Sequence, residues 1–134
     1  MQFAILGSAD SWYFKDLERA AGDRHQLLPL PFSTISAGVE SGGQRQLAGQ
    51  HPLQQVDAVL VRTMPPGSLE QVVFRMDVLD ALARQGVPVV NPPATIEAAV
   101  DKYRTLSRLQ EAGLPVPRTM VCQGVEEAME AFVA

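Results

Sequence analysis

The stretch VDAVLVRTMPPGSLEQVVFRMDVLDALARQGVPVV, residues 56–90, decides the fold class. Its first six residues are nearly all apolar and rich in β-branched side chains, which predicts a strand buried on both faces. Apolar residues then recur at helical spacing from Leu69 to Ala83, and Gly86 predicts the end of that helix. Residues 87–90 are a second short apolar run. The stretch therefore predicts two parallel strands joined by a helix.

The residues before this unit predict a second strand–helix–strand unit. Residues 3–6 are apolar and end at Gly7, residues 13–21 have the spacing of an amphipathic helix, and residues 25–30 predict another strand. Residues 33–55 are rich in Ser, Gly and Gln, which predicts a long loop.

Further helices are expected after residue 90. Residues 91–93, Asn-Pro-Pro, predict a helix start because proline suits the first helical turn, and Asp101 is expected to cap a second helix. Behind a proline linker at residues 115–117, residues 118–122 predict a fifth strand and residues 125–133 a final helix.

The order of these elements predicts an α/β fold. We expect a Rossmann-like parallel sheet of about four strands with helices on both faces, followed by a short carboxyl-terminal strand–helix extension. Residues 1–113 are predicted to form one domain, and residues 114–134 to begin a second, truncated one. In such sheets ligands bind at the carboxyl ends of the strands.

Composition excludes several classes of protein. The chain has 134 residues, 46% of them hydrophobic and 19% charged, which is ordinary globular composition. Fifteen acids against eleven bases give a net charge of −4, so nucleic acid is not an expected partner. No apolar run suits a membrane helix or a secretory signal, so we expect a cytoplasmic protein. A single cysteine, Cys122, excludes an intrachain disulfide, and no metal site is apparent.

Arg62 is the most informative polar residue from position alone. It ends the buried strand of residues 56–61, at the expected ligand edge. A guanidinium group can hold a carboxylate or phosphate through two parallel hydrogen bonds. The alternative is a structural ion pair with Asp10 or Asp57, and position alone does not separate the two.

Lys102 is one of only two lysines in the chain. It follows Asp101 at the start of a predicted helix, where an ammonium group and the helix terminus together suit a nucleotide phosphate. By spacing alone, a solvated surface lysine is the simpler interpretation. No catalytic triad or spaced pair of carboxylates is found, so no residue is predicted to be catalytic.

Two other α/β families fit less well. The loop that begins Gly7-Ser8 keeps only the first glycine of the G-x-G-x-x-G dinucleotide motif, so an NAD site is a weak alternative. A phosphorylated receiver domain needs an aspartate after its third strand, where this chain has Arg62.

Three segments together resemble a known family. The sequences NPPATI at residues 91–96, DKYRTL at 101–106 and AGLPVPRT at 112–119 resemble ATP-grasp ligases, and most closely the RimK-like branch, which adds glutamate to carboxyl groups. The shared pattern spans about residues 91–122, whereas residues 1–55 match only in the order of their elements.

The resemblance implies a pre-ATP-grasp domain, a linker helix and the first part of an ATP-binding domain. It implies that Lys102 reaches ATP phosphates, that Arg62 faces the substrate cleft, and that Asn91 is a weaker candidate for substrate binding. It also implies that ATP phosphorylates a carboxylate, which an amine then attacks, with Mg²⁺ offsetting the phosphate charge. The magnesium ligands are expected beyond residue 134, so the chain alone is predicted to be inactive.

The implied partners are a small-molecule or peptide carboxylate and an amino-acid substrate. Family members are commonly oligomeric, so a homo-oligomer is one expectation, although the sequence leaves the quaternary state open. The main alternative function is a non-catalytic Rossmann-like module that binds a small anion or a protein partner. Half of a two-domain NAD enzyme is a third interpretation.

Overall fold

The computed structural model describes residues 1–133. The chain forms two compact units, which divide between Thr95 and Ile96. The boundary expected at residue 113 concerns the domains of a longer protein and stays a prediction.

A parallel sheet of four strands forms the centre of the first unit, as predicted. All three neighbouring pairs are parallel, and Ala4 on the first strand lies opposite both Leu28 and Val59. The strand order in space is β2-β1-β6-β7, so the order reverses between β1 and β6. The strands are β1 (Gln2–Leu6), β2 (Gln26–Leu30), β6 (Ala58–Val61) and β7 (Val89–Val90).

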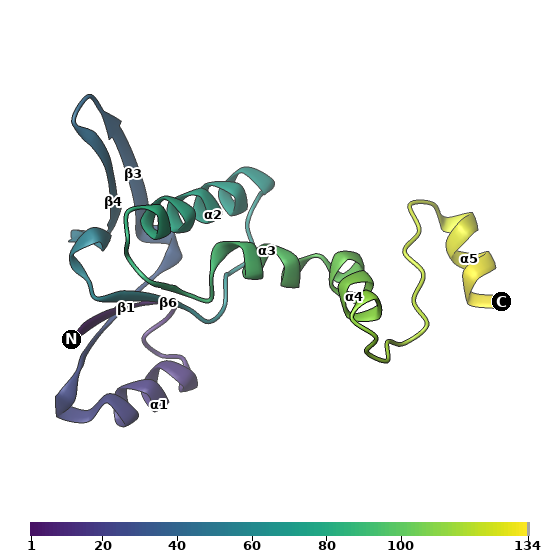
Figure 1. Ribbon diagram of the computed structural model, residues 1–134, viewed down its shortest axis with the longest axis horizontal. Coiled ribbons are helices and arrows are strands. Elements are labelled where there is room, and N and C mark those ends of the chain that lie inside the picture. Colours follow the sequence, from purple (N-terminus) through teal and green to yellow (C-terminus); the bar gives the residue numbers. More distant parts are fainter. Residues whose placement is uncertain (134) are drawn as a thin grey trace. The chain divides into compact units, whose positions relative to one another are not determined.

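Two helices connect these strands and cover the two faces of the sheet. Helix α1 (Trp12–Ala21) joins β1 to β2, and helix α2 (Leu69–Arg84) joins β6 to β7. Figure 1 shows α1 and α2 on opposite sides of the sheet. This arrangement follows from right-handed crossovers, because the two connections run in opposite directions along the sheet.

Serine side chains fix where both helices begin. Ser11 accepts a hydrogen bond from the backbone of Phe14 at the start of α1. Ser68 and Gln71 form a reciprocal capping box at the start of α2. Such caps satisfy backbone N–H groups that have no partner within the helix. The loops after β1 and β6 are therefore anchored where they enter the helices.

The core lies where the sheet packs against α2. Ile5 and Leu6 on β1, Val59 on β6, and Leu79 and Leu82 on α2 are almost fully inaccessible to solvent. Burying one such side chain contributes roughly 1.5–3 kcal/mol to folding. The predicted strands at residues 3–6 and 56–61 are confirmed, although the second begins at Ala58.

Residues 33–55 were predicted to be a long loop, but residues 35–52 within that range form a second sheet. This sheet is antiparallel, in the order β3-β4-β5, with a hairpin that turns near Gly43 at a φ of 130°. Gln46 is buried and its side-chain amide contacts that of Gln54. The loop prediction was wrong because backbone pairing and burial, which composition does not reveal, hold these polar strands together. The strands are β3 (Ile35–Glu40), β4 (Gly43–Ala48) and β5 (His51–Pro52).

The helices after residue 92 meet as predicted at Asp101. Its carboxylate accepts a hydrogen bond from the backbone of Arg104, 2.9 Å away, and so caps α4. Thr105 Oγ1 donates to the carbonyl of Ala98 at 2.6 Å, which ties α4 to the end of α3. The helices are α3 (Pro93–Val100), α4 (Lys102–Glu111) and α5 (Val125–Val133).

The fifth strand predicted at residues 118–122 does not form. The described segment pairs with no other strand. An apolar, extended sequence becomes a strand only where a neighbour supplies hydrogen-bond partners, and the pairings among residues 1–133 offer none here. Helix α5 does form, and its Phe132 is 88% exposed. No helix among the described residues has the length and hydrophobicity to cross a membrane.

Candidate functional site

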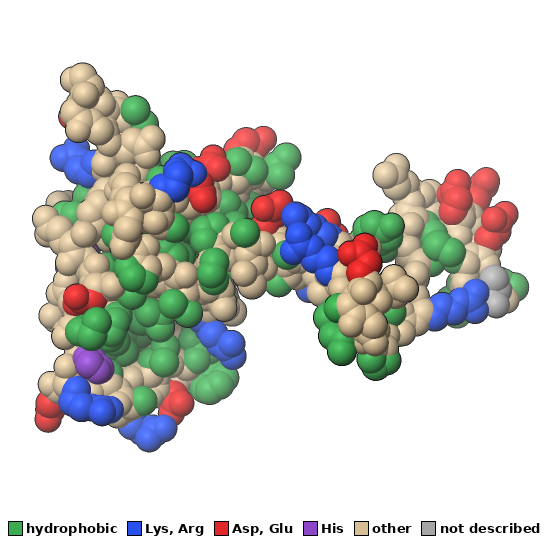
Figure 2. Space-filling model, in the orientation of Figure 1, with side chains coloured by type: hydrophobic (Ala, Val, Ile, Leu, Met, Phe, Trp, Pro, Cys, Tyr) green, Lys and Arg blue, Asp and Glu red, His purple; other side chains and the backbone are tan. Residues whose placement is uncertain are grey.

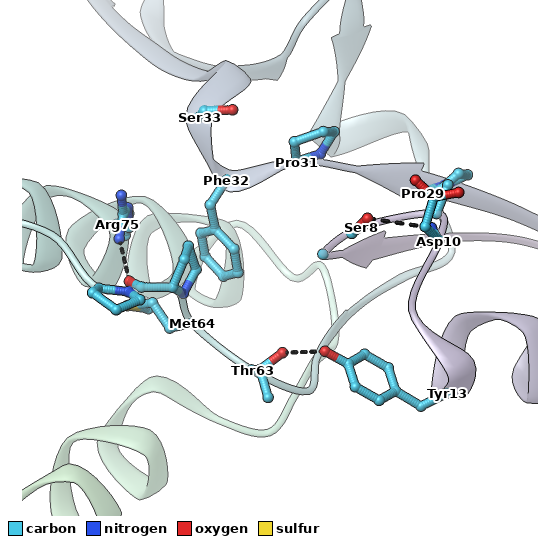
Figure 3. Close-up of a pocket in the computed structure, with 14 residues that line it drawn as sticks. Ser8, Asp10, Tyr13, Pro29, Pro31, Phe32, Ser33, Thr63, Met64 and Arg75 are labelled. Atoms are coloured by element: carbon cyan, nitrogen blue, oxygen red, sulfur yellow. Dashed lines mark hydrogen bonds between the residues drawn. The ribbon is translucent and has the colours of Figure 1, made fainter.

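A cavity lies at the carboxyl edge of the parallel sheet, where the strand order reverses. Its volume is about 920 Å³, and it is lined by the loops after β1, β2 and β6 together with Tyr13 of α1 and Arg75 of α2 (Figure 3). Loops that diverge at such a reversal leave a crevice between them, which is where α/β sheets bind ligands. The cavity therefore occupies the position predicted for a site.

Arg75 is the buried cation of this cavity. Its residue exposure is 9%, and its Nη1 donates a hydrogen bond of 2.8 Å to the carbonyl of Pro65. Its guanidinium carbon lies 5.7 Å from the centre of the Phe32 ring. No carboxylate of residues 1–133 lies within 4.0 Å of it as an ion-pair partner. Arg75 thus positions the loop after β6 while its own charge has no acidic partner in the described chain.

Gly67 shows how closely this loop approaches α2. A Cβ atom added at Gly67 would lie 2.8 Å from Gln71 Oε1 and 3.1 Å from Arg75 Nη1. Any side chain would have to displace these two groups. The glycine of the Pro-Pro-Gly sequence therefore allows the loop to close onto the helix.

Tyr13 and Thr63 join the loop after β6 to α1. Their hydroxyl groups share a hydrogen bond of 2.7 Å, and Figure 3 shows both side chains directed toward each other. The guanidinium carbon of Arg62 lies 5.9 Å from the centre of the Tyr13 ring.

Arg62 is exposed and does not line the cavity. Within the described residues it forms no ion pair with Asp10 or Asp57. Asp57 instead accepts a hydrogen bond from the backbone of Gln2 at 2.6 Å. The structural ion pair considered as the alternative for Arg62 is therefore not formed, and its substrate role stays a prediction.

Asn91 lies at the same edge of the sheet as Arg62. Its Nδ2 donates a hydrogen bond of 3.1 Å to the carbonyl of Val61, and so joins the ends of β7 and β6. The residue is exposed, but this amide group already has a backbone partner. A substrate role for Asn91 stays a prediction.

Lys102 belongs to the second unit and is the first residue of α4. The side chain is exposed, and its Nζ lies 3.4 Å from the carbonyl of Ala99. The predicted placement at a helix start, directly after the Asp101 cap, is correct. Its contact with ATP stays a prediction.

Charged side chains of both signs are scattered over the face shown in Figure 2. Among residues 1–133, His, Cys, Asp and Glu side chains form no group of three or more that would hold a metal ion.

Sequence reasoning missed the residues that build the cavity, above all Arg75 and Phe32. One indication was available for Arg75. It lies on the face of α2 that also carries Val78, Leu79 and Leu82, all buried. A cation within an apolar helical face indicates a charge that folding places inside the protein.

Two curated relatives share significant sequence similarity with the chain. It is 44% identical over 107 residues to the tetrahydromethanopterin:alpha-L-glutamate ligase of Methanosarcina acetivorans, covering 78% of this chain and 33% of that protein. It is 36% identical over 77 residues to the ligase of the same name from Methanocaldococcus jannaschii, covering 58% of this chain and 25% of that protein. The chain thus spans a third or less of the length of these relatives. No family model matches it.

Solved structures of the ATP-grasp ligase PsnB share the fold. The complex with a minimal precursor has a TM-score of 0.65 at 21% identity, covering 97% of this chain and 49% of that chain. The complex with precursor peptide PsnA2 and AMPPNP has a TM-score of 0.60 at 21% identity, covering 97% and 50%.

The fold is therefore one found in ATP-grasp ligases. Within that class, the chain is related in sequence to the glutamate ligases named above, and its predicted resemblance to RimK-like glutamate ligases is confirmed.

Proposed function

We propose that this chain is part of an ATP-dependent carboxylate–amine ligase that joins glutamate to an acceptor carboxylate. The observation that supports this most strongly is the 44% identity to a glutamate ligase over 107 residues. The fold shared with PsnB supports the same class of enzyme independently of sequence identity.

The two units have different proposed roles. The cavity at the sheet edge takes one substrate. Arg62 and Asn91, which lie at the same edge but outside the cavity lining, contact the part of that substrate that extends beyond the cavity. Lys102, exposed at the start of α4, contacts the phosphates of ATP. An ammonium group and backbone N–H groups at a helix start are both suited to a phosphate.

The proposed reaction has two steps. An oxygen of the acceptor carboxylate attacks the γ-phosphorus of ATP, which releases ADP and forms an acylphosphate. The glutamate nitrogen then attacks the acyl carbon, phosphate leaves with the bonding electron pair, and the nitrogen loses a proton to give the amide. Magnesium, when bound, offsets the charge of the transferring phosphoryl group. The described residues supply binding and orientation.

The acceptor is a small-molecule or peptide carboxylate. The names of the sequence relatives favour a pterin-type acceptor, whereas the PsnB complexes contain a precursor peptide. Solved PsnB complexes also contain magnesium with ADP, which supports the same pair of cofactors here.

The test is ADP release by the natural protein that contains this chain. We expect ADP to be released when an acceptor and glutamate are both present. Mass spectrometry should then show that the acceptor has gained one glutamyl residue. A protein that binds carboxylates but releases no ADP with any acceptor would support the alternative, a non-catalytic anion-binding module.

A further inference from the structure

We propose that Arg75 is the anion anchor of the sheet-edge cavity, and that the ligand held there is a carboxylate on a flat, apolar body. One part of this proposal rests on the proposed function, namely that the bound ligand is a substrate of the ligase. The binding itself requires neither ATP nor turnover.

The first argument is the unbalanced charge of Arg75. The residue is nine-tenths buried and lines the cavity. A guanidinium group has five N–H donors, and the hydrogen bond to Pro65 uses one of them. Buried cations are normally paired, because an isolated charge loses its hydration without compensation. With no ion-pair partner among residues 1–133, the matching negative charge is expected from a ligand.

The second argument is the nature of the walls beside Arg75. Phe32 is 4% exposed and its ring lies beneath the guanidinium group. Pro31 and Met64 add rigid or apolar surface to the lining (Figure 3), and so does Pro65. Such walls favour a ligand body that is apolar and flat, with a few polar groups to orient it.

The orientation of the ligand follows from Asp10. Figure 3 shows Asp10 and Ser8 on the opposite side of the cavity from Arg75. A carboxylate at Asp10 repels an anion and attracts a hydrogen-bond donor. The acid group of the ligand therefore binds at the Arg75 end.

A carboxylate fits this cavity better than a phosphate. The loop after β1 keeps a single glycine, Gly7, so it lacks the glycine-rich cradle through which backbone N–H groups bind phosphates. Ser11 and Ser68 already accept hydrogen bonds from the first turns of α1 and α2. A single guanidinium group matches the single charge and planar geometry of a carboxylate.

The competing role for Arg75 is purely structural, as the residue that holds the Pro65 carbonyl. Three variants separate the two roles. Arg75→Lys keeps a cation that can reach Pro65 but loses the planar fork, Arg75→Met removes the charge, and Arg84→Met removes an exposed arginine of the same helix as a control.

The experiment is an NMR titration of the 134-residue chain with benzoate, which combines a carboxylate and a flat apolar ring. Benzamide is the uncharged probe of the same shape, and inorganic phosphate is the second anion. We expect saturable shifts at Arg75 Nε–H and at the amides of residues 7–10 and 32–33, with a dissociation constant on the order of 1 mM for so small a ligand.

Benzamide and phosphate should bind at least about tenfold more weakly than benzoate. Arg75→Met and Arg75→Lys should lose benzoate by a similar factor, and Arg84→Met should bind it like the unaltered chain. Equal binding of benzoate and benzamide, shifts centred on Arg62, or tighter binding of phosphate would overturn the proposal.

If Arg75→Met does not fold, the benzoate affinity of Arg75→Lys and the positions of the benzoate-induced NMR shifts in the unaltered chain still decide whether Arg75 binds the carboxylate. No saturable shift in the cavity at about tenfold above the expected dissociation constant would also overturn it. Failure of ATP-dependent ligation alone would contradict the proposed function and leave this site standing.

Discussion

The hydroxyl groups of Tyr13 and Thr63, fifty residues apart in the chain, lie 2.7 Å apart and share a hydrogen bond. This bond connects α1, which follows β1, to the loop that follows β6. It therefore joins the two sides of the point where the strand order reverses. The cavity beside it is lined by the loops that follow both strands.

Replacing Tyr13 by phenylalanine should loosen this connection. One hydrogen bond between partly exposed hydroxyls contributes about 0.5–1.5 kcal/mol, so we expect a loss of stability near the lower end of that range. Urea denaturation measures it, with Tyr103→Phe as the control because Tyr103 is 68% exposed on α4. In a double-mutant cycle with Thr63→Val, additive losses would show that the bond does not couple the two residues.

Arg62→Ala should act on the substrate rather than on the fold. Arg62 is exposed and its guanidinium group lies over the Tyr13 ring, so we expect the free energy of unfolding to change by less than about 0.5 kcal/mol. In the natural protein, the KM for the acceptor should rise while the KM for ATP stays nearly constant. A collapse of stability would instead make Arg62 a structural residue.

Lys102→Ala should weaken the interaction with ATP. A charged hydrogen bond to a phosphate contributes about 1.5–3 kcal/mol, so we expect more than tenfold loss in kcat/KM for ATP. Lys15→Ala, at the other lysine of the chain, is the matched control. ATP kinetics within about twofold of the unaltered enzyme would remove Lys102 from the site.

The pKa of Glu70 is lowered, first because the Ser68 hydroxyl donates a hydrogen bond to its carboxylate and second through a backbone hydrogen bond. A carboxyl group with a lowered pKa in the folded state stabilises the fold above its unfolded pKa, and this contribution is lost as pH falls through the folded value. We expect Ser68→Ala to raise the pKa of Glu70 toward its ordinary range. An NMR titration of the Glu70 carboxyl carbon checks this, and an unchanged midpoint would exclude the hydroxyl as the cause.

Periodicity was enough to predict the parallel sheet and its helices. The apolar run at residues 56–61 identifies β6, because a strand buried on both faces is a continuous apolar run. The spacing from Leu69 to Ala83 identifies α2, because a helix buried on one face has apolar residues at helical spacing. The helix cap at Asp101 could also be predicted from the residues next to it in the sequence. The strands β3 and β4 were missed because their stability depends on each other, and no pattern within residues 35–40 reveals the partner.

The candidate site was predictable in place but not in composition. A parallel sheet brings the carboxyl ends of its strands to one edge. The order of the strands and helices along the chain was therefore enough to place a candidate site after β6. The arginine that enters the cavity was indicated only by the place of Arg75 on the apolar face of α2. Its position in the cavity could not be inferred, because Arg75 meets Phe32, which is distant in sequence. Arg62, the arginine chosen from position, lies outside the lining.

The most direct measurement of the central claim follows oxygen from the acceptor. The natural protein that contains this chain is supplied with ATP, magnesium, glutamate and an acceptor labelled with ¹⁸O in its carboxylate. An acylphosphate route predicts that one labelled oxygen appears in each inorganic phosphate released, in step with amide formation. Amide formation with unlabelled phosphate, or with the label in AMP, would contradict this account.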